Sequence, residues 1–226
     1  MNEGLQILPI GIQNFEMLRR EDFLYVDKTG QLLKLIKNGR RYFLSRPRRF
    51  GKSLTISTLD AMLSGKAELF RGLAAENWVA LQAQNPAPVL RLDMSTMETE
   101  APSSFENSLC ETLARRGMQE NVRFISRAAR GMLEDLLGGL YRTHGPVVVL
   151  IDEYDKPILD NIGNIEAADA MRQALRSFYT VLKGCDEYLR FVLLTGISKF
   201  SKVGVFSAMN NLNDISMDEQ YGDIVG

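Results

Sequence analysis

The sequence predicts an α/β fold in which a mainly parallel β-sheet carries helices on both of its faces. Four short apolar runs have the length of buried strands, and helical patterns separate them along the chain. Strands that alternate with helices favour a parallel sheet, because each connecting helix returns the chain to the end from which the strands start. Right-handed crossovers then place the carboxyl ends of all strands at one edge, where open α/β sheets bind their ligands.

Each element is predicted from its local pattern. The strand candidates are residues 42–45, 89–92, 147–151 and 191–194. The last two runs do not alternate with polar residues, as expected for strands that are covered on both faces. A helix is predicted at 53–63, because apolar residues recur there at helical spacing and Gly65 follows as a stop signal. Further helices are predicted at 104–115, 125–143 and 165–182.

Composition excludes several classes of protein. The 226 residues include 27 Lys plus Arg and 28 Asp plus Glu, which argues against a generally basic nucleic-acid coat. The hydrophobic content of 45% is that of a globular protein. Cys110 and Cys185 lack metal-ligand spacing, so neither a disulfide framework nor a zinc site is expected. No signal peptide or membrane-spanning run is recognisable, so we expect a cytoplasmic protein without membrane contacts.

The first strand candidate runs directly into a basic loop at 46–53, and a helical pattern follows at once. This order suits a phosphate-binding loop, because free backbone N–H groups at a helix start attract anions. Lys52 is expected to reach the β- and γ-phosphates, and the Ser53 hydroxyl is expected to hold Mg²⁺. Simple helix capping by the Gly-Lys-Ser triplet is the alternative. The residues predicted to bind the nucleotide are Pro47, Arg48, Arg49, Phe50, Gly51, Lys52, Ser53 and Leu54.

The entrance to this loop departs from the usual phosphate-loop pattern, because Arg46 stands where a glycine is common. Pro47 restricts Arg46 to extended backbone angles, so the loop must make its turn by a stiffer path. Residues 40–59 also hold six cations and no acid. We expect this charge to gather where phosphate binds. A surface patch for a partner or nucleic acid is the alternative, above all for Arg40 and Arg41.

The most apolar strand candidate, 147–151, is followed directly by two acids, Asp152 and Glu153. Carboxylates beside a core are costly unless a cation balances them, and Mg²⁺ bound by Asp152 and Ser53 is the expected cation. Glu153 is expected to point the other way on an extended backbone and to activate the attacking water as general base. The alternative is that Asp152 caps a helix while Glu153 and Asp155 are solvated.

The last strand candidate leads into two hydroxyl residues, Thr195 and Ser198, at the same edge of the sheet. Either is expected to act as a polar sensor that contacts the γ-phosphate or the attacking water. With Lys52 and Glu153 they complete the predicted catalytic group. Ordinary strand-end and turn formation is the alternative for both.

Taken in this order, the motifs resemble those of the bacterial AAA-ATPase-like family of P-loop proteins. The matching stretches are 8–11, 25–29, 46–53, 150–157 and 194–201. The resemblance implies a three-layer P-loop NTPase of the additional-strand class, similar to RecA and AAA proteins. It also implies Walker A and Walker B motifs, with ATP and Mg²⁺ as cofactors. An Arg in place of the first loop glycine is usual for this family.

Proteins of this type often continue into a nuclease-like domain of the PD-(D/E)xK kind, which these residues do not match. The chain stops within an apolar, strand-like stretch at 221–226, so we expect a truncated polypeptide. The expected organisation is an N-terminal arm and helix at 1–40 that packs on a P-loop ATPase-like domain at 41–226.

The expected function is ATP binding and Mg²⁺-dependent hydrolysis to ADP and phosphate, which drives or gates a partner domain. A nucleotide-gated switch or scaffold with negligible turnover would use the same binding residues. A nucleic-acid-binding protein that uses the basic loop is a further alternative. An oligomer, and a C-terminal nuclease-like domain in a longer form, are partners that the sequence leaves open.

Overall fold

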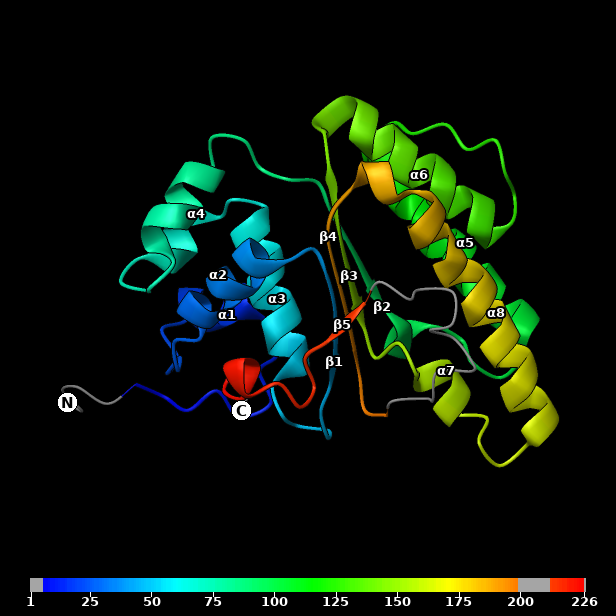
Figure 1. The fold of residues 1–226 in the computed structure, drawn as a ribbon, viewed down its shortest axis with the longest axis horizontal. Coiled ribbons are helices and arrows are strands. Elements are labelled where there is room, and N and C mark those ends of the chain that lie inside the picture. The colour runs from blue at the N-terminus through cyan, green and yellow to red at the C-terminus, as the bar shows by residue number, and fades with distance from the viewer. Residues whose placement is uncertain (1–5, 199–211, 226) are drawn as a thin grey trace.

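The computed structural model describes residues 6–198 and 212–225 as one three-layered body, with a sheet between two groups of helices (Figure 1). The sheet has five strands in the order β2-β3-β4-β1-β5. Every neighbouring pair is parallel. The predicted α/β fold, with a parallel sheet and helices on both faces, is therefore confirmed.

Strand β4 lies between β1 and β3, which is the additional strand that the predicted class of P-loop fold requires. The four predicted strands are all present, three of them extended by one residue and β4 by four. A fifth strand, β5, was not predicted and pairs with β1 through only two residues. The strands are β1 (Arg41–Ser45), β2 (Val89–Asp93), β3 (Val147–Asp152), β4 (Leu189–Gly196) and β5 (Asn213–Asp214).

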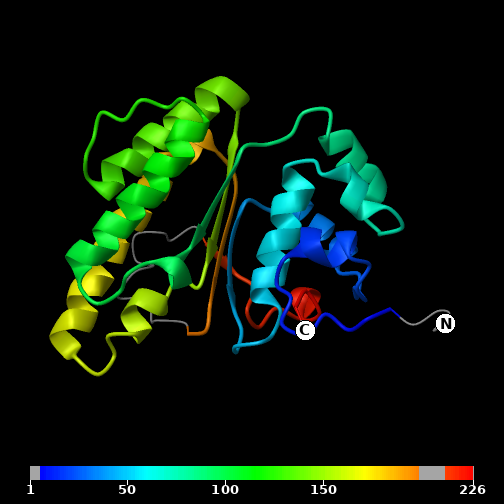
Figure 2. The same ribbon diagram turned by 180° about the vertical axis from the view of Figure 1, so that it is seen from behind.

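The helices divide between the two faces of the sheet, as the opposite views in Figures 1 and 2 show. One face carries α1 (Phe15–Arg20), α2 (Thr29–Asn38), α3 (Lys52–Leu63) and α4 (Glu76–Gln82). The other carries α5 (Pro102–Gln119), α6 (Ala129–His144), α7 (Lys156–Leu159) and α8 (Ile165–Gly184). No helix within the described ranges is long and apolar enough to cross a membrane.

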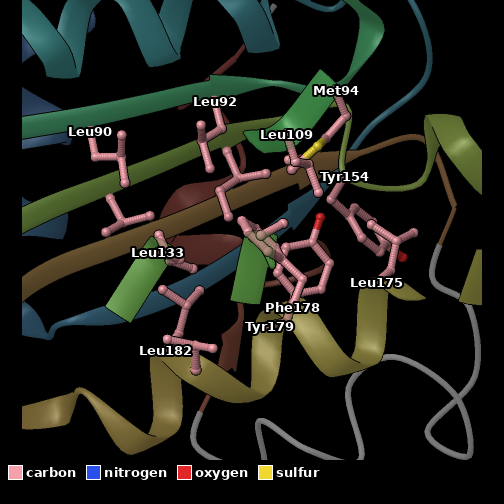
Figure 3. Close-up of a cluster of buried hydrophobic side chains, with 14 of the residues drawn as sticks. Leu90, Leu92, Met94, Leu109, Leu133, Tyr154, Leu175, Phe178, Tyr179 and Leu182 are labelled. Carbon is pink, nitrogen blue, oxygen red and sulfur yellow. The ribbon is translucent and has the colours of Figure 1, made fainter. Parts of the chain in front are cut away.

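The core consists of two clusters, one on each face of the sheet. Strand β3 contributes side chains to both clusters. Val147, Val149 and Ile151 pack toward α5, α6 and α8. Val148 and Leu150 pack on the opposite side toward α3. Figure 3 shows the cluster between α8 and the sheet, which includes Tyr154 and Tyr179. Full burial on both faces explains why the sequence of β3 does not alternate.

Helix α1 holds the N-terminal residues against the helix that follows the basic loop. The backbone N–H of Phe15 donates to Ser57 Oγ on α3 at 2.9 Å. The Phe15 ring is fully buried and stacks edge-on against Tyr25 at 5.1 Å between ring centroids. Burial of such a ring stabilises the fold by about 1.5–3 kcal/mol, so Phe15 anchors α1 to the rest of the molecule.

Helix α5 is longer than the predicted 104–115, and two predicted segments do not form the expected helix or strand. Helix α6 begins at Ala129 and not at residue 125, because Asp135 Oδ2 accepts the backbone N–H groups of Ile125 and Ser126. Because this carboxylate satisfies both N–H groups, residues 125 and 126 do not need helical hydrogen bonds. The stretch from residue 221 is not a strand either. Tyr221 ends a short 3₁₀-helix, and Ile224 is buried in the cluster beside α3.

Candidate functional site

The basic loop joins β1 to α3 at the carboxyl edge of the sheet. Ser45 pairs with Gly196 of β4, and the Arg46 N–H donates to the Gly196 carbonyl at 3.1 Å. Arg49 and Gly51 both have left-handed backbone angles, with φ of 66° and 78°. That conformation costs a non-glycine residue about 1–2 kcal/mol. The loop is thus a tight turn that leads straight into the first turn of α3.

The side chain of Lys52 lies inside this turn and is only 5% exposed. Its ammonium donates to the carbonyl oxygens of Arg46 and Pro47, each at 2.9 Å. Burial lowers the pKa of Lys52 below its usual value, while the negative charges of Asp152 and Glu153 oppose that shift. Lys52 therefore lies within electrostatic reach of the acids that end β3.

Asp152 is the last residue of β3 and is 1% exposed. One carboxylate oxygen, Oδ1, accepts the Thr195 hydroxyl and the Glu153 N–H. The other, Oδ2, is buried and has no hydrogen-bond partner among the described residues. A buried acceptor without a donor costs about 1–3 kcal/mol. Such an oxygen suits a divalent cation, which favours carboxylate ligands.

A cation at this point would need ligands besides the protein's carboxylates. Within residues 6–198 and 212–225, no three His, Cys, Asp or Glu side chains gather closely enough to hold a metal ion. Ser53 lies half-buried in the first turn of α3, beside Lys52. The donor set of Asp152, Ser53, phosphate and water fits Mg²⁺, which usually keeps substrate and water oxygens in its shell.

Glu153 does not continue the extended backbone of β3, so that expectation is wrong. Its φ is 50°, because the chain turns sharply there and the Glu153 carbonyl accepts the N–H of Lys156 in α7. Burial raises the pKa of the Glu153 carboxyl, and the charges of Asp152 and Asp93 add to the rise. A residue with a strained backbone and a partly desolvated carboxyl is typical of functional sites.

The two hydroxyl residues after β4 already have partners. Thr195 is fully buried, and its hydroxyl donates to Asp152. The Ser198 hydroxyl donates to Asp155 Oδ2 at 2.8 Å. Both hydroxyls therefore face the acids that follow β3, and their use as sensors stays a prediction.

The cations of residues 40–59 do not gather at one place, in contrast to the expectation. Arg40 and Arg41 stand at the start of β1, whose five residues span roughly 15 Å. Arg41 forms an ion pair there with Asp186. At the loop itself, Arg46 donates to the Ser216 carbonyl and so ties the loop to the segment that follows β5.

The remaining predicted binding residues occupy the tip of the loop and the first turns of α3. Pro47, Arg48, Arg49 and Phe50 are exposed. Gly51 and Leu54 line a pocket of about 260 Å³. Its other walls come from the N-terminal arm, with Leu8 and Val26, and from the C-terminal segment, with Ile224. An apolar pocket therefore adjoins the basic loop.

Sequence reasoning missed two acids at this edge. Asp93 ends β2 in register with Asp152, and its Oδ1 accepts the Ser95 N–H at 2.9 Å. The signal was present, because Asp93 follows an apolar run just as Asp152 does. The second acid is Asp155. One interpretation of the sequence leaves its side chain solvated, yet it is fully buried. No local pattern distinguishes it from an exposed carboxylate.

Comparisons with known proteins found a family model and a relative for this chain. A family model described as a predicted AAA-ATPase matches residues 9–206. An uncharacterized protein in the vnfD 5' region of Azotobacter chroococcum mcd 1 is 43% identical over 222 residues. The match covers 97% of this chain and 42% of that relative, so the chain spans less than half of the relative's length.

The search of solved structures found the Aeropyrum pernix Orc1 protein, whose structure is a complex with DNA. It matches with a TM-score of 0.41 and 14% sequence identity. The similarity covers 77% of this chain and 39% of the Orc1 chain.

Proposed function

The chain belongs to the family of predicted AAA-ATPases and is a P-loop nucleotide-binding protein, and from that premise we propose that it is a Mg²⁺-dependent ATPase. The reaction is hydrolysis of ATP to ADP and phosphate in the cytoplasm. The supporting observation is that Lys52, buried at the start of α3, lies within electrostatic reach of Asp152, buried at the end of β3. Strand β4 separates these two strands and carries Thr195, which contacts Asp152.

The loop binds the β- and γ-phosphates. The Lys52 ammonium is held by two carbonyl oxygens, and it exchanges these neutral acceptors for charged phosphate oxygens. Charge-assisted hydrogen bonds are roughly twice as strong as neutral ones, so the exchange favours the bound state. Arg48 and Arg49, exposed at the tip of the loop, add positive charge around the phosphates.

Asp152 and Ser53 are the residues that would hold Mg²⁺ together with the phosphates. Bound there, Mg²⁺ supplies neutralisation of the charge that develops on the phosphate oxygens. Thr195 fixes the rotation of the Asp152 carboxylate by binding Oδ1, which leaves Oδ2 for the metal. The protein thus presents one oriented oxygen without a rearrangement.

Glu153 accepts a proton from the attacking water. Its raised pKa makes the carboxylate a better base than an exposed glutamate, which suits general-base catalysis near neutral pH. In this proposal Asp152 binds the metal and Glu153 takes the proton, so the two tasks fall to different carboxylates.

The pocket beside the loop receives the adenine ring. Leu8 and Val26 form one wall, and Leu54 forms another next to the phosphate loop. Apolar side chains around a planar ring are the usual lining of such sites. The N-terminal arm would then contribute directly to nucleotide affinity.

A nucleotide-gated switch with negligible turnover is the second candidate. The hydroxyls of Thr195 and Ser198 donate to Asp152 and Asp155. Because these hydroxyls already have partners, they are not free to contact the γ-phosphate, which favours a protein that binds nucleotide without hydrolysing it. Single-turnover kinetics separate the two candidates. Phosphate release from fully ATP-loaded protein that requires Mg²⁺ supports the ATPase, and no release refutes hydrolysis in favour of the switch.

We propose that the partners act on a longer form of the protein. We propose that ATP binding drives or gates a further domain, such as a nuclease-like one, since the Azotobacter relative is more than twice as long as the matched region. Assembly into oligomers and contact of Arg48 and Arg49 with nucleic acid are tested on that longer form. DNA affinity that falls steeply with salt and is competed by ATP would place both ligands on the same basic loop.

A further inference from the structure

Two loops at the carboxyl edge of the sheet are joined by hydrogen bonds. We call residues 152–155 the acidic turn and residues 195–198 the β4 exit. Thr195 Oγ1 donates to Asp152, and the Tyr154 N–H donates to the Thr195 carbonyl at 2.9 Å. The Tyr154 hydroxyl donates to the Ser198 carbonyl at 2.8 Å. Asp152 and Tyr154 therefore contact both ends of the β4 exit.

Asp155 makes the densest of these contacts. Its Oδ2 accepts the N–H groups of Ile197 and Ser198 at 2.9 and 2.8 Å, and the Ser198 hydroxyl at 2.8 Å. Asp155 occupies the N-cap position of α7, yet its carboxylate makes no capping hydrogen bond to that helix as described. The side chain instead crosses to the β4 exit, which local helix formation does not require.

The surroundings keep this carboxylate in place. Asp155 and Tyr154 are both fully buried. A Cβ on Gly196 would lie 2.5 Å from the Tyr154 ring and 2.8 Å from Asp155 Oδ1, so only glycine permits this approach. Lys52 lies within electrostatic reach of Asp155, which connects the contact to the phosphate loop.

We propose that Asp155 is a positioning residue that locks the β4 exit to the acidic turn, so that the two loops respond to nucleotide as one unit. This inference rests on the proposed function, because Asp152 and Glu153 in the acidic turn are the residues assigned to metal and water. A carboxylate with three donors on one oxygen is a strong, directional link. A shift of the acidic turn on ATP binding is then transmitted to Thr195 and Ser198.

The test compares Asp155→Ala, Asp155→Asn and the parent by two measurements. Without nucleotide, hydrogen exchange of the Ile197 and Ser198 amides should accelerate at least about tenfold in Asp155→Ala. With Mg²⁺ and ATP, kcat should fall about tenfold or more while the Kd for ATP stays within about threefold. Asp155→Asn keeps an oxygen acceptor without the charge, so it should fall between the parent and Asp155→Ala in both measurements.

Asp135→Ala is the matched control, because Asp135 Oδ2 also accepts two backbone N–H groups but lies on α6. It should leave exchange at residues 197–198 and kcat unchanged. Parental exchange at these amides in Asp155→Ala, or a kcat loss as large in Asp135→Ala, would overturn the inference. If Asp155→Ala does not fold, Asp155→Asn decides in the same way: unchanged exchange and unchanged kcat refute the link.

The exchange measurement needs no hydrolysis, so the two proposals can fail separately. A parent protein without turnover refutes the ATPase, while the effect of Asp155→Ala on exchange still supports or refutes the link. In that case ATP-induced protection of residues 197–198 should appear in the parent and be lost in Asp155→Ala. A parent with normal turnover and an inert Asp155 refutes the link alone.

Discussion

The Thr195 hydroxyl donates to Asp152 Oδ1 across two neighbouring strands, and both side chains are buried. The bond fixes the carboxylate in one rotation and leaves its Oδ2 without a partner among the residues described. Two residues 43 positions apart in the sequence thus form a preoriented ligand at the carboxyl edge of the sheet.

Replacing Lys52 should weaken nucleotide binding without unfolding the protein. Lys52→Ala removes the buried ammonium, which lies within electrostatic reach of Asp152 and Glu153. We expect the Kd for ATP to rise about 10–100-fold, because the free energy lost is that of one hydrogen bond to a charged group. Titration with a fluorescent ATP analogue measures this. Lys37→Ala, at the exposed end of α2, is the control and should bind as the parent does.

Replacing Glu153 should separate binding from turnover. Glu153→Gln keeps the shape of the side chain but cannot accept the proton of the attacking water. We expect kcat to fall about 10²–10⁴-fold while ATP remains bound with parental affinity. Phosphate release and equilibrium binding measure the two effects, with the exposed Glu166→Gln on α8 as control. Equal turnover by Glu153→Gln and the parent would remove Glu153 from the mechanism.

Removing the Thr195 hydroxyl should release the Asp152 carboxylate. Thr195→Val keeps the side-chain volume but leaves Oδ1 with only the Glu153 N–H. We expect the free energy of unfolding to fall by about 1–3 kcal/mol, and more Mg²⁺ to be needed for ATP binding. Urea unfolding and Mg²⁺ titration measure these changes. Thr180→Val, on the surface of α8, should alter neither, and a normal Mg²⁺ requirement in Thr195→Val would refute the orienting role.

The raised pKa of Glu153 predicts a pH-dependent stability. Burial raises this pKa first, and Asp152 and Asp93 add to it, so ionisation costs the folded protein more than the unfolded chain. The protonated group therefore stabilises the fold at low pH, and this contribution is lost as the pH rises through the raised pKa. Glu153→Gln cannot ionise, so it should be more stable than the parent at neutral pH.

The stability difference between Glu153→Gln and the parent should shrink as the pH falls toward the usual carboxyl range. Urea unfolding of both proteins at a series of pH values from about 4 to about 8 measures it. Because both proteins share every other titrating group, the difference isolates Glu153. A difference that does not change with pH would contradict a raised pKa at this residue.

Much of the fold could be predicted because its strands are signalled locally. Strand β3 is apolar on both faces, and it is buried on both faces. The β4 run carries the same signal and adopts the same state. The start of α6 could not be predicted in this way, since Asp135 takes up the amides of residues 125 and 126 from within the helix. Strand β5 has only two polar residues and exists through its pairing with β1.

The site was predictable in its motifs but not in its backbone. The loop, Asp152 and the carboxyl edge followed from strand, loop and helix order. The left-handed turn at Glu153 did not, because glutamate has no preference for it and the fold imposes it. Arg40 and Arg41 were grouped with the loop because they are near it in sequence, whereas β1 carries them to the opposite edge.

Gly196 should be irreplaceable for a steric reason. Its φ is not in the left-handed region, so backbone strain is not the issue, but an added Cβ would lie 2.5 Å from the Tyr154 ring. Overpacking of this kind costs about 1–3 kcal/mol, so Gly196→Ala should lower the free energy of unfolding by that amount. It should also lower kcat, because Tyr154 must move and it carries a bond to the β4 exit. Gly184→Ala at the end of α8 meets no atom within 4 Å and should be neutral or slightly stabilising. Thermal unfolding of the three proteins measures the effect, and a Gly196→Ala protein as stable as the parent would show that the acidic turn and the β4 exit are not closely packed.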